Sequence, residues 1–221
     1  MFNFEDAWSY IPELLAGALI SVELTLIVMV ISLVAGLVLA LGKVSSNRLL
    51  STAATIYIEV IRGTPCLLQL FYIYFVLPAF GIKFPPFAAG VAGLAINYSA
   101  YLAEVYRAGI EAVAKHQVEA SMALGMSRTQ MLRLIILPQA IRVVVPSLGN
   151  YFISLFNDTS LVSIVTVREL MFTGQIISAS NFQYFTFFKI IGIIYLSISY
   201  PASLLVRWLE RVTRIGGLSA R

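Results

Sequence analysis

Residues 14–41 read LLAGALISVELTLIVMVISLVAGLVLAL, a run that contains one charged side chain, Glu23. A helix of about 20 apolar residues is long enough to cross the hydrocarbon core of a bilayer. Because backbone polar groups find no water there, a helix that bonds its own backbone is the default spanning element. This run therefore predicts a membrane-spanning helix, and four further apolar stretches follow it.

The composition of the whole chain agrees with a membrane protein. The 221 residues are 59% hydrophobic and 12% charged, and the mean hydropathy is +0.88. Soluble domains carry about 25% charged residues. We predict an all-α, polytopic membrane helix bundle that forms a single transmembrane domain over residues 1–221. Its five expected spans are 14–41, 52–77, 87–110, 141–167 and 184–205.

The distribution of basic residues predicts the orientation of these spans, because cytoplasmic loops are enriched in Lys and Arg. Most bases fall in the first loop, in the loop 111–137 with its flanks, and in the C-terminal tail. The opposite side holds only Lys83, Arg168 and Lys189, and the N-terminal segment is acidic. We expect the N-terminus outside and the C-terminus and loop 111–137 inside. The net charge of +4 follows from this distribution and requires no nucleic acid.

A short polar motif lies in the loop 111–137. Residues 119–125 read EASMALG, and IILP follows at 135–138. Glycine adopts the positive φ that ends many helices, and proline, which lacks an amide donor, ends or kinks a helix. The motif predicts a helix of small residues, a corner at Gly125 and a second helix that Pro138 ends or kinks. An ordinary helix–turn–helix between two spans would also have glycine and proline at its turns.

This motif resembles the EAA loop of the transmembrane permease subunits of ABC importers, with Ser121 in place of the second alanine. EVIRGTPCLLQ at 59–69 resembles the E-x-x-R-G-T-P-x-x-x-Q segment of the polar amino acid branch of that family. NDTSL at 157–161 is similar to its K-x-T-S-L segment, although Asn157 stands where lysine is usual. The resemblance implies a multi-pass protein of the bacterial cytoplasmic (inner) membrane.

The resemblance also implies partners. The EAA loop is a coupling helix that docks on an ATPase subunit, and the expected coupling residues are Glu119, Ala120, Ser121, Ala123, Leu124, Gly125 and Arg128. The expected partners are a pair of P-loop ATPase subunits, a second permease subunit (a copy or a close relative) and an extracytoplasmic solute-binding protein. The chain has no G-x-x-x-x-G-K-[ST] loop. We therefore expect ATP to bind the partner, and we expect no cofactor and no enzymatic activity in this chain.

Polar side chains inside the spans mark the expected substrate path, since an ionisable group in a bilayer is costly unless it faces a partner or water. Helical spacing places Glu59, Arg62, Cys66 and Gln69 on one stripe of the second span. Glu59 and Arg62, with Glu104 and Arg107, could instead form a structural salt-bridge cluster near the cytoplasmic end. The expected path residues are Glu59, Arg62, Gln69, Asn97, Tyr101, Glu104, Asn157, Asp158 and Ser160.

The charged residues of the expected path limit which substrates it can carry. Arg62 is the only base well within a span, and its planar guanidinium suits a carboxylate. The acids Glu59, Glu104 and Asp158 outnumber it. We predict a subunit of an ATP-driven importer that works by alternating access and carries polar amino acids, with basic ones preferred over acidic ones.

Two other classes of membrane protein are alternatives to an ATP-driven importer. An ion-gradient-driven secondary transporter or channel would use the intramembrane acids as ion sites, although no inverted repeat is visible across the spans. An intramembrane enzyme is disfavoured, because the single His116 and single Cys66 lie in separate environments and form no nucleophile–base pair or metal set. Dependence on a separate ATPase distinguishes the importer from both.

Overall fold

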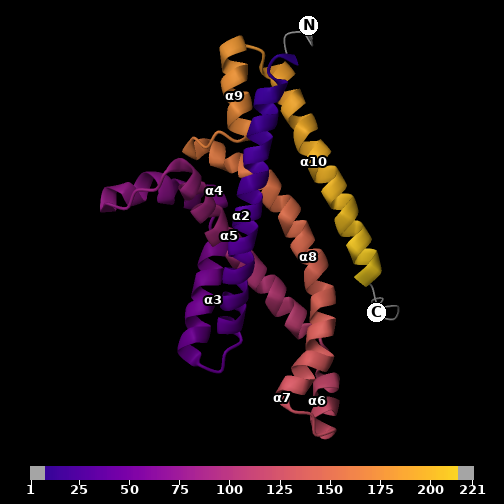
Figure 1. The fold of residues 1–221 in the computed structure, drawn as a ribbon. Helices are drawn as coiled ribbons and strands as arrows, with labels where there is room; N and C mark the ends of the chain where they lie inside the picture. The colour runs from indigo at the N-terminus through magenta and orange to yellow at the C-terminus, as the bar shows by residue number, and fades with distance from the viewer. Residues whose placement is uncertain (1–7, 214–221) are drawn as a thin grey trace.

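The computed structural model describes residues 8–213, which form an elongated bundle of helices (Figure 1). In chain order, the elements of the first half are α2 (Ile11–Lys43), α3 (Arg48–Arg62), α4 (Cys66–Phe71), a π-helical turn (Tyr72–Val76), a 3-10 turn (Leu77–Phe80) and α5 (Pro86–Glu111). Those of the second half are α6 (Lys115–Ala123), α7 (Arg128–Met131), a π-helical turn (Leu132–Ile136), α8 (Leu137–Asp158), a 3-10 segment (Thr159–Val165), α9 (Leu170–Asn181) and α10 (Tyr184–Thr213).

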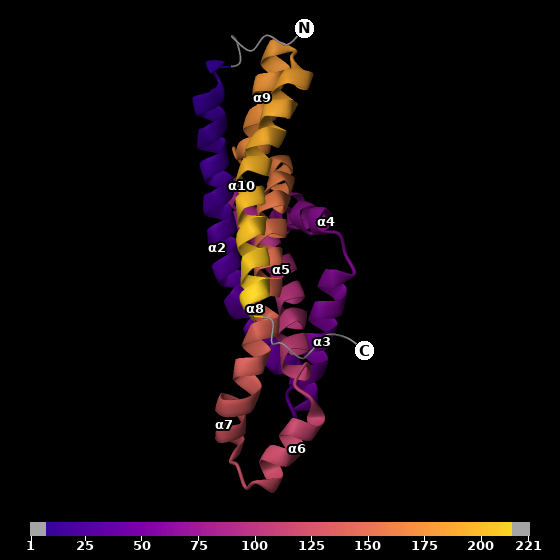
Figure 2. The ribbon, with the colours of Figure 1, turned by 90° about the vertical axis from the view of Figure 1, so that its right-hand side faces the viewer.

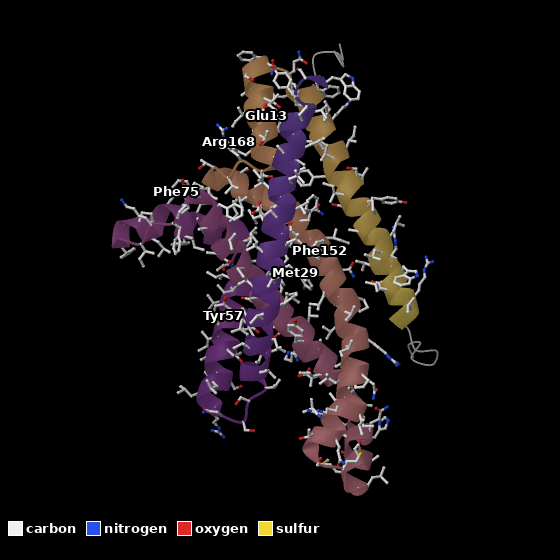
Figure 3. The ribbon with its side chains drawn as sticks, in the orientation of Figure 1. Glu13, Met29, Tyr57, Phe75, Phe152 and Arg168 are labelled. Carbon is white, nitrogen blue, oxygen red and sulfur yellow. The ribbon has the colours of Figure 1, made fainter. Side chains whose placement is uncertain are left out.

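The core lies where α2, α5 and α8 meet. Met29 of α2 and Phe152 of α8 belong to one apolar cluster with Leu94 and Leu102 of α5 (Figure 3). Small residues let membrane helices approach closely. At Gly36 an added Cβ would lie 2.9 Å from Cβ of Leu102, so α2 and α5 need glycine at this crossing.

The bundle has two distinct ends. The first turn of α2 and α9 lie at one end, and α6, α7 and the turn between α2 and α3 lie toward the other (Figures 1 and 2). Among the described residues, the helices long and apolar enough to cross a membrane are Ile11–Lys43, Thr129–Val165 and Tyr184–Val212. The bent pair α3–α4 would add a fourth. The all-α membrane bundle is confirmed, whereas five spans and their orientation stay predictions.

The second predicted span is not one straight helix. The chain breaks between α3 and α4, and the segments Arg48–Arg62 and Cys66–Phe80 enclose a bend of 101°. Pro65 lacks an amide donor and disfavours helical backbone at the preceding residue, which explains the break. The segment after the break projects sideways from the bundle as an arm (Figure 1), with Phe75 exposed on it (Figure 3). The expectation of one continuous polar stripe through this span was therefore wrong.

Two other predictions about helix boundaries need correction. Pro138 does not end the second helix of the motif, because one helix runs through it from Thr129 to Val165. The preceding turn is π-helical, and the amide of Leu137 bonds the carbonyl of Leu132. Residues 173–183, which fall between the last two expected spans, belong mostly to α9. Within α9, the side chains of Ser178, Ser180 and Asn181 donate hydrogen bonds to carbonyls of the same helix.

Candidate functional site

Gln69 of α4 stabilises the break in the second span. Its side-chain nitrogen donates hydrogen bonds to the carbonyl of Ile61 at 2.8 Å and to the carbonyl and hydroxyl oxygens of Thr64 at 3.2 and 2.8 Å. Carbonyls at the end of a helix have no partner within it, so these bonds supply what α3 lacks. The side-chain oxygen of Gln69 accepts a 3.1 Å hydrogen bond from Asn97 of α5. Gln69 thus has a structural role here.

The break opens beside a cavity of about 480 Å³ between α3, α4, α5 and α8. This volume lies within the range of small-molecule sites, about 300–1,000 Å³. Four of the nine predicted path residues line the cavity, together with other tyrosines and the single cysteine. The lining includes the side chains of Arg62, Cys66, Asn97, Tyr98, Tyr101, Tyr151, Ser154 and Asp158.

One cation and one anion line this cavity. The guanidinium of Arg62 lies over the ring of Tyr101, 5.4 Å from its centroid. The hydroxyl of Tyr98 donates a 2.7 Å hydrogen bond to the carboxylate of Asp158. The ring of Tyr151 packs against those of Tyr98 and Tyr101, with centroids 6.3 and 5.9 Å apart. The cavity therefore combines opposite charges with aromatic walls.

Glu104 does not face this cavity but is the centre of an ion cluster one turn along α5. It accepts hydrogen bonds from Lys43 of α2 at 2.7 Å and from Arg107, whose Nη2 is also 2.7 Å away. Glu59 lies 3.6 Å from Lys43, and Arg62 approaches Glu104 at 3.8 Å. Glu59 and Glu104 are thus partners of basic side chains, as the salt-bridge alternative expected. Sequence reasoning placed Arg107 in this cluster but missed Lys43 as a partner of the two acids.

The remaining predicted path residues lie elsewhere. The side-chain oxygen of Asn157 accepts a 3.0 Å hydrogen bond from Ser199 of α10, and Ser160 donates to the carbonyl of Asn157. Neither is among the residues that line the cavity. Asn157 and Asp158 are adjacent on a helix, so their side chains point in different directions, and only Asp158 faces the cavity.

The motif 119–125 folds as predicted from its letters. Gly125 has φ +72° and follows α6, which confirms the glycine corner. Ser121 is buried and donates to the carbonyl of Gln117. Met122 and Leu124 are 57% and 82% exposed, and Glu119, Ala120 and Ala123 are exposed beside them. Arg128 begins α7, but its side chain lies outside the described part of the structure.

A buried acid, Glu169, was not predicted. Its carboxylate caps α9 by accepting 2.8 Å hydrogen bonds from the amides of Met171 and Phe172. It also accepts from the hydroxyls of Tyr195 at 3.1 Å and Ser21 at 3.3 Å. Burial raises the pKa of this carboxyl, and the hydrogen bonds oppose that shift. Glu169 joins α9 to α2 and α10, and no local sequence pattern predicts these contacts.

Comparison with known proteins places this arrangement in a family. Residues 32–215 match the family described as "Binding-protein-dependent transport system inner membrane component". The chain is 40% identical over 201 residues to a probable amino-acid ABC transporter permease of Sinorhizobium fredii, covering 91% of this chain and 87% of that protein. It is 37% identical over 216 residues to the glutamine transport system permease of Escherichia coli, covering 97% and 99%.

A solved structure has the same fold. The crystal structure of an amino acid ABC transporter with histidines superposes with a TM-score of 0.92 at 40% identity, covering 96% of this chain and 99% of that one. The fold and the exposed coupling motif define a transmembrane permease subunit of an ABC importer. The chain belongs to the family of binding-protein-dependent transport system inner membrane components. It is a multi-pass protein of the bacterial inner membrane, and the prediction of an ABC importer permease is confirmed.

Proposed function

We propose that this permease carries polar amino acids through the cavity between Arg62 and Asp158, and that it prefers cationic or neutral polar amino acids over acidic ones. The observation that carries this proposal is the presence of one guanidinium and one carboxylate in a single cavity. The named relatives above transport, or are described as transporting, amino acids.

The two charges match the two ends of a zwitterion. Arg62 binds the α-carboxylate through its planar, forked donors, and Asp158 accepts from the α-ammonium. Arg62 is the sole cation among the described residues that line the cavity. An acidic amino acid would bring a second carboxylate without a second cation, which is costly in a partly desolvated site. The tyrosine rings offer faces on which a cationic side chain can lie.

In the sequence alone, Glu59 and Glu104 count as acids of the path and favour cationic substrates. In the structure both are paired with Lys43, and Glu104 also with Arg107. The preference now depends on the missing second cation and on the aromatic walls. Of the predicted path, we retain Arg62, Asn97, Tyr101 and Asp158 as candidate substrate contacts.

The test is amino acid uptake by cells that produce the chain with its native partners. Asp158→Asn should lower uptake of L-arginine and L-glutamine at limiting concentration about ten-fold or more, because a charge-assisted hydrogen bond is worth about 1.5–3 kcal/mol. The control is Glu13→Gln, which removes an exposed carboxylate at the start of α2. Uptake by Asp158→Asn at the wild-type rate, with normal membrane levels, would overturn the proposal.

We also propose that α6 and Gly125 form the surface that docks on a P-loop ATPase, which binds the ATP. A second permease subunit would complete the path, and a solute-binding protein would deliver the amino acid from outside. The exposed Leu124 supports this role, because an apolar side chain with 82% exposure in an aqueous loop is suited to bury against a partner. The basic residues of the loops support an orientation with this surface in the cytoplasm, the N-terminus outside and the C-terminus inside.

Affinity purification in mild detergent tests the docking surface. The tagged wild-type chain should co-purify with an ATPase subunit, and Leu124→Glu should lose it. Leu49→Glu is the matched control, because Leu49 is 79% exposed and lies in the first turn of α3, which begins near the same end of the molecule (Figure 1). Retention of the ATPase by Leu124→Glu would rule out this surface.

A further inference from the structure

Three cations surround the carboxylate of Glu104, and they contact it unequally. Lys43 donates to Oε1 at 2.7 Å, and Arg107 donates to Oε2 from Nη2 at 2.7 Å and from Nε at 3.1 Å. Nη1 of Arg62 stands 3.8 Å from Oε2, beyond hydrogen-bond range. Both oxygens of Glu104 are therefore occupied by cations other than Arg62.

Arg62 consequently keeps its donors free. Its guanidinium stacks over Tyr101 and lines the cavity, and its side chain is 37% exposed. Within residues 8–213 it makes no hydrogen bond to another side chain, although guanidinium carries five donors. Glu104 and Lys43 are better shielded, with side-chain exposures of 16% and 18%. Ion-pair energies at such shielded sites are larger than at the surface.

We propose that Lys43 is a positioning residue for substrate binding: by occupying Glu104, it leaves the Arg62 guanidinium free to bind the carboxylate of the amino acid. This inference depends on the proposed function, because it requires a substrate carboxylate at Arg62. Lys43 itself lies in the ion cluster, where it also approaches Glu59 at 3.6 Å, and it is not among the residues that line the cavity.

Removal of the lysine charge should change the partner of Arg62. In Lys43→Met, Oε1 of Glu104 loses its donor, and Arg62, whose Nη1 lies 3.8 Å from Oε2, is the cation of the cluster that has no hydrogen bond to Glu104 and can replace it. A guanidinium bonded to Glu104 is then withheld from the substrate. Glu104→Gln in the same chain removes the competing charge and should release Arg62 again. If Lys43 only stabilised the fold, Glu104→Gln would not restore substrate binding to the Lys43→Met variant.

Cys66 provides the measurement, because it is the single cysteine of the chain and lines the cavity. Membranes from cells that produce the chain with its partners are labelled with a fluorescent maleimide, and the chain is separated on a gel. L-arginine or L-glutamine, whichever slows labelling more in the wild type, is titrated to give a half-protecting concentration. Cys66→Ser is the blank, and Arg48→Met removes an exposed cation outside the cluster as a control.

We expect Lys43→Met to raise the half-protecting concentration about ten-fold, the effect of losing one charge-assisted hydrogen bond. Lys43→Arg should stay within about two-fold of the wild type, and Lys43→Met/Glu104→Gln should return close to it. An unchanged value for Lys43→Met overturns the inference, as does a double variant as impaired as the single one. If Lys43→Met fails to reach the membrane, Glu104→Gln is the variant that tests the inference. A half-protecting concentration above that of the wild type in Glu104→Gln also overturns the inference.

Failure of the proposed function is separable from failure of this inference. If no amino acid slows labelling, or if Arg62→Met is protected as well as the wild type, Arg62 does not bind the substrate and both proposals fall. If Arg62→Met abolishes protection while the Lys43 variants behave as the wild type, only the role of Lys43 is lost.

Discussion

Asn97 of α5 donates a hydrogen bond of 3.1 Å to Gln69 of α4, so the broken span is tied to the helix that forms the opposite wall of the cavity. Asn97 also lines the cavity, whereas Gln69 lies behind it and holds the carbonyls at the end of α3. The shape of the cavity therefore depends on a side chain that does not face it.

Replacement of Gln69 should destabilise the break. Gln69→Leu removes the donor to Ile61 and Thr64, and it leaves the buried side chain of Asn97 without its acceptor, at a cost of about 1–3 kcal/mol for that group. We expect a lower apparent Tm of the protein in detergent. Ser197→Ala is the control, since that exposed hydroxyl donates only to the carbonyl of Ile194 in its own helix. Equal Tm values for both variants would show that Gln69 does not hold the break.

Gly36→Ala should loosen the crossing of α2 and α5. The new Cβ would lie 2.9 Å from Cβ of Leu102 and 3.1 Å from the carbonyl oxygen of Ser99, so the helices must separate. Overpacking of this kind costs about 1–3 kcal/mol. Gly192→Ala is the matched control, because an added Cβ there meets no atom within 4 Å. The two Tm values in detergent should differ, with Gly36→Ala lower, and the reverse order would contradict the observed packing.

Gly125→Val should uncouple transport while leaving insertion intact. Valine at φ +72° is strained by about 1–3 kcal/mol, so the corner after α6 would change direction. The added Cβ itself has room, since no atom lies within 4 Å of its position. Gly192→Val shares this room without the positive φ, and it serves as the control. We expect normal membrane levels of both variants, with uptake lost only in Gly125→Val; wild-type uptake by Gly125→Val would refute the role of the corner.

Glu169 predicts a pH dependence of stability. Burial raises the pKa of its carboxyl above the ordinary value of 4.5. The stability that the group contributes is therefore complete below the ordinary value and is lost as pH rises through the raised folded pKa. Glu169→Gln removes this titration and also weakens the cap of α9. The Tm of the wild type should fall toward that of the variant as pH rises, and a Tm difference that widens would contradict the raised pKa of Glu169.

The sequence was sufficient to predict an all-α membrane bundle, because apolar length alone identifies spanning helices. It also identified Arg62 and Asp158, since an ionisable group in an apolar span needs a partner or water. Gly63, Thr64 and Pro65 interrupt the helical spacing of the second span, because proline disfavours helical backbone at the residue before it. At this position the turn residues outweigh the periodicity of the polar side chains.

The contacts that the sequence could not provide are tertiary. Lys43 and Glu104 are 61 residues apart, and Ser21 and Glu169 are 148 apart. Their pairing depends on which faces of the helices meet, and no local pattern encodes that. The same limit explains Asn157, whose place in a family segment suggested the substrate path, while its position on the helix turns it toward α10.

The measurement that tests the central claim most directly is maleimide labelling of Cys66 in native membranes with and without amino acids. Cys66, Arg62 and Asp158 line the same cavity, so an amino acid bound there must shield the thiol. We predict that L-arginine or L-glutamine slows labelling of the wild type more than L-glutamate does, and that Asp158→Asn removes this protection. Labelling at one rate with every amino acid, in the presence of all partners, would contradict the account.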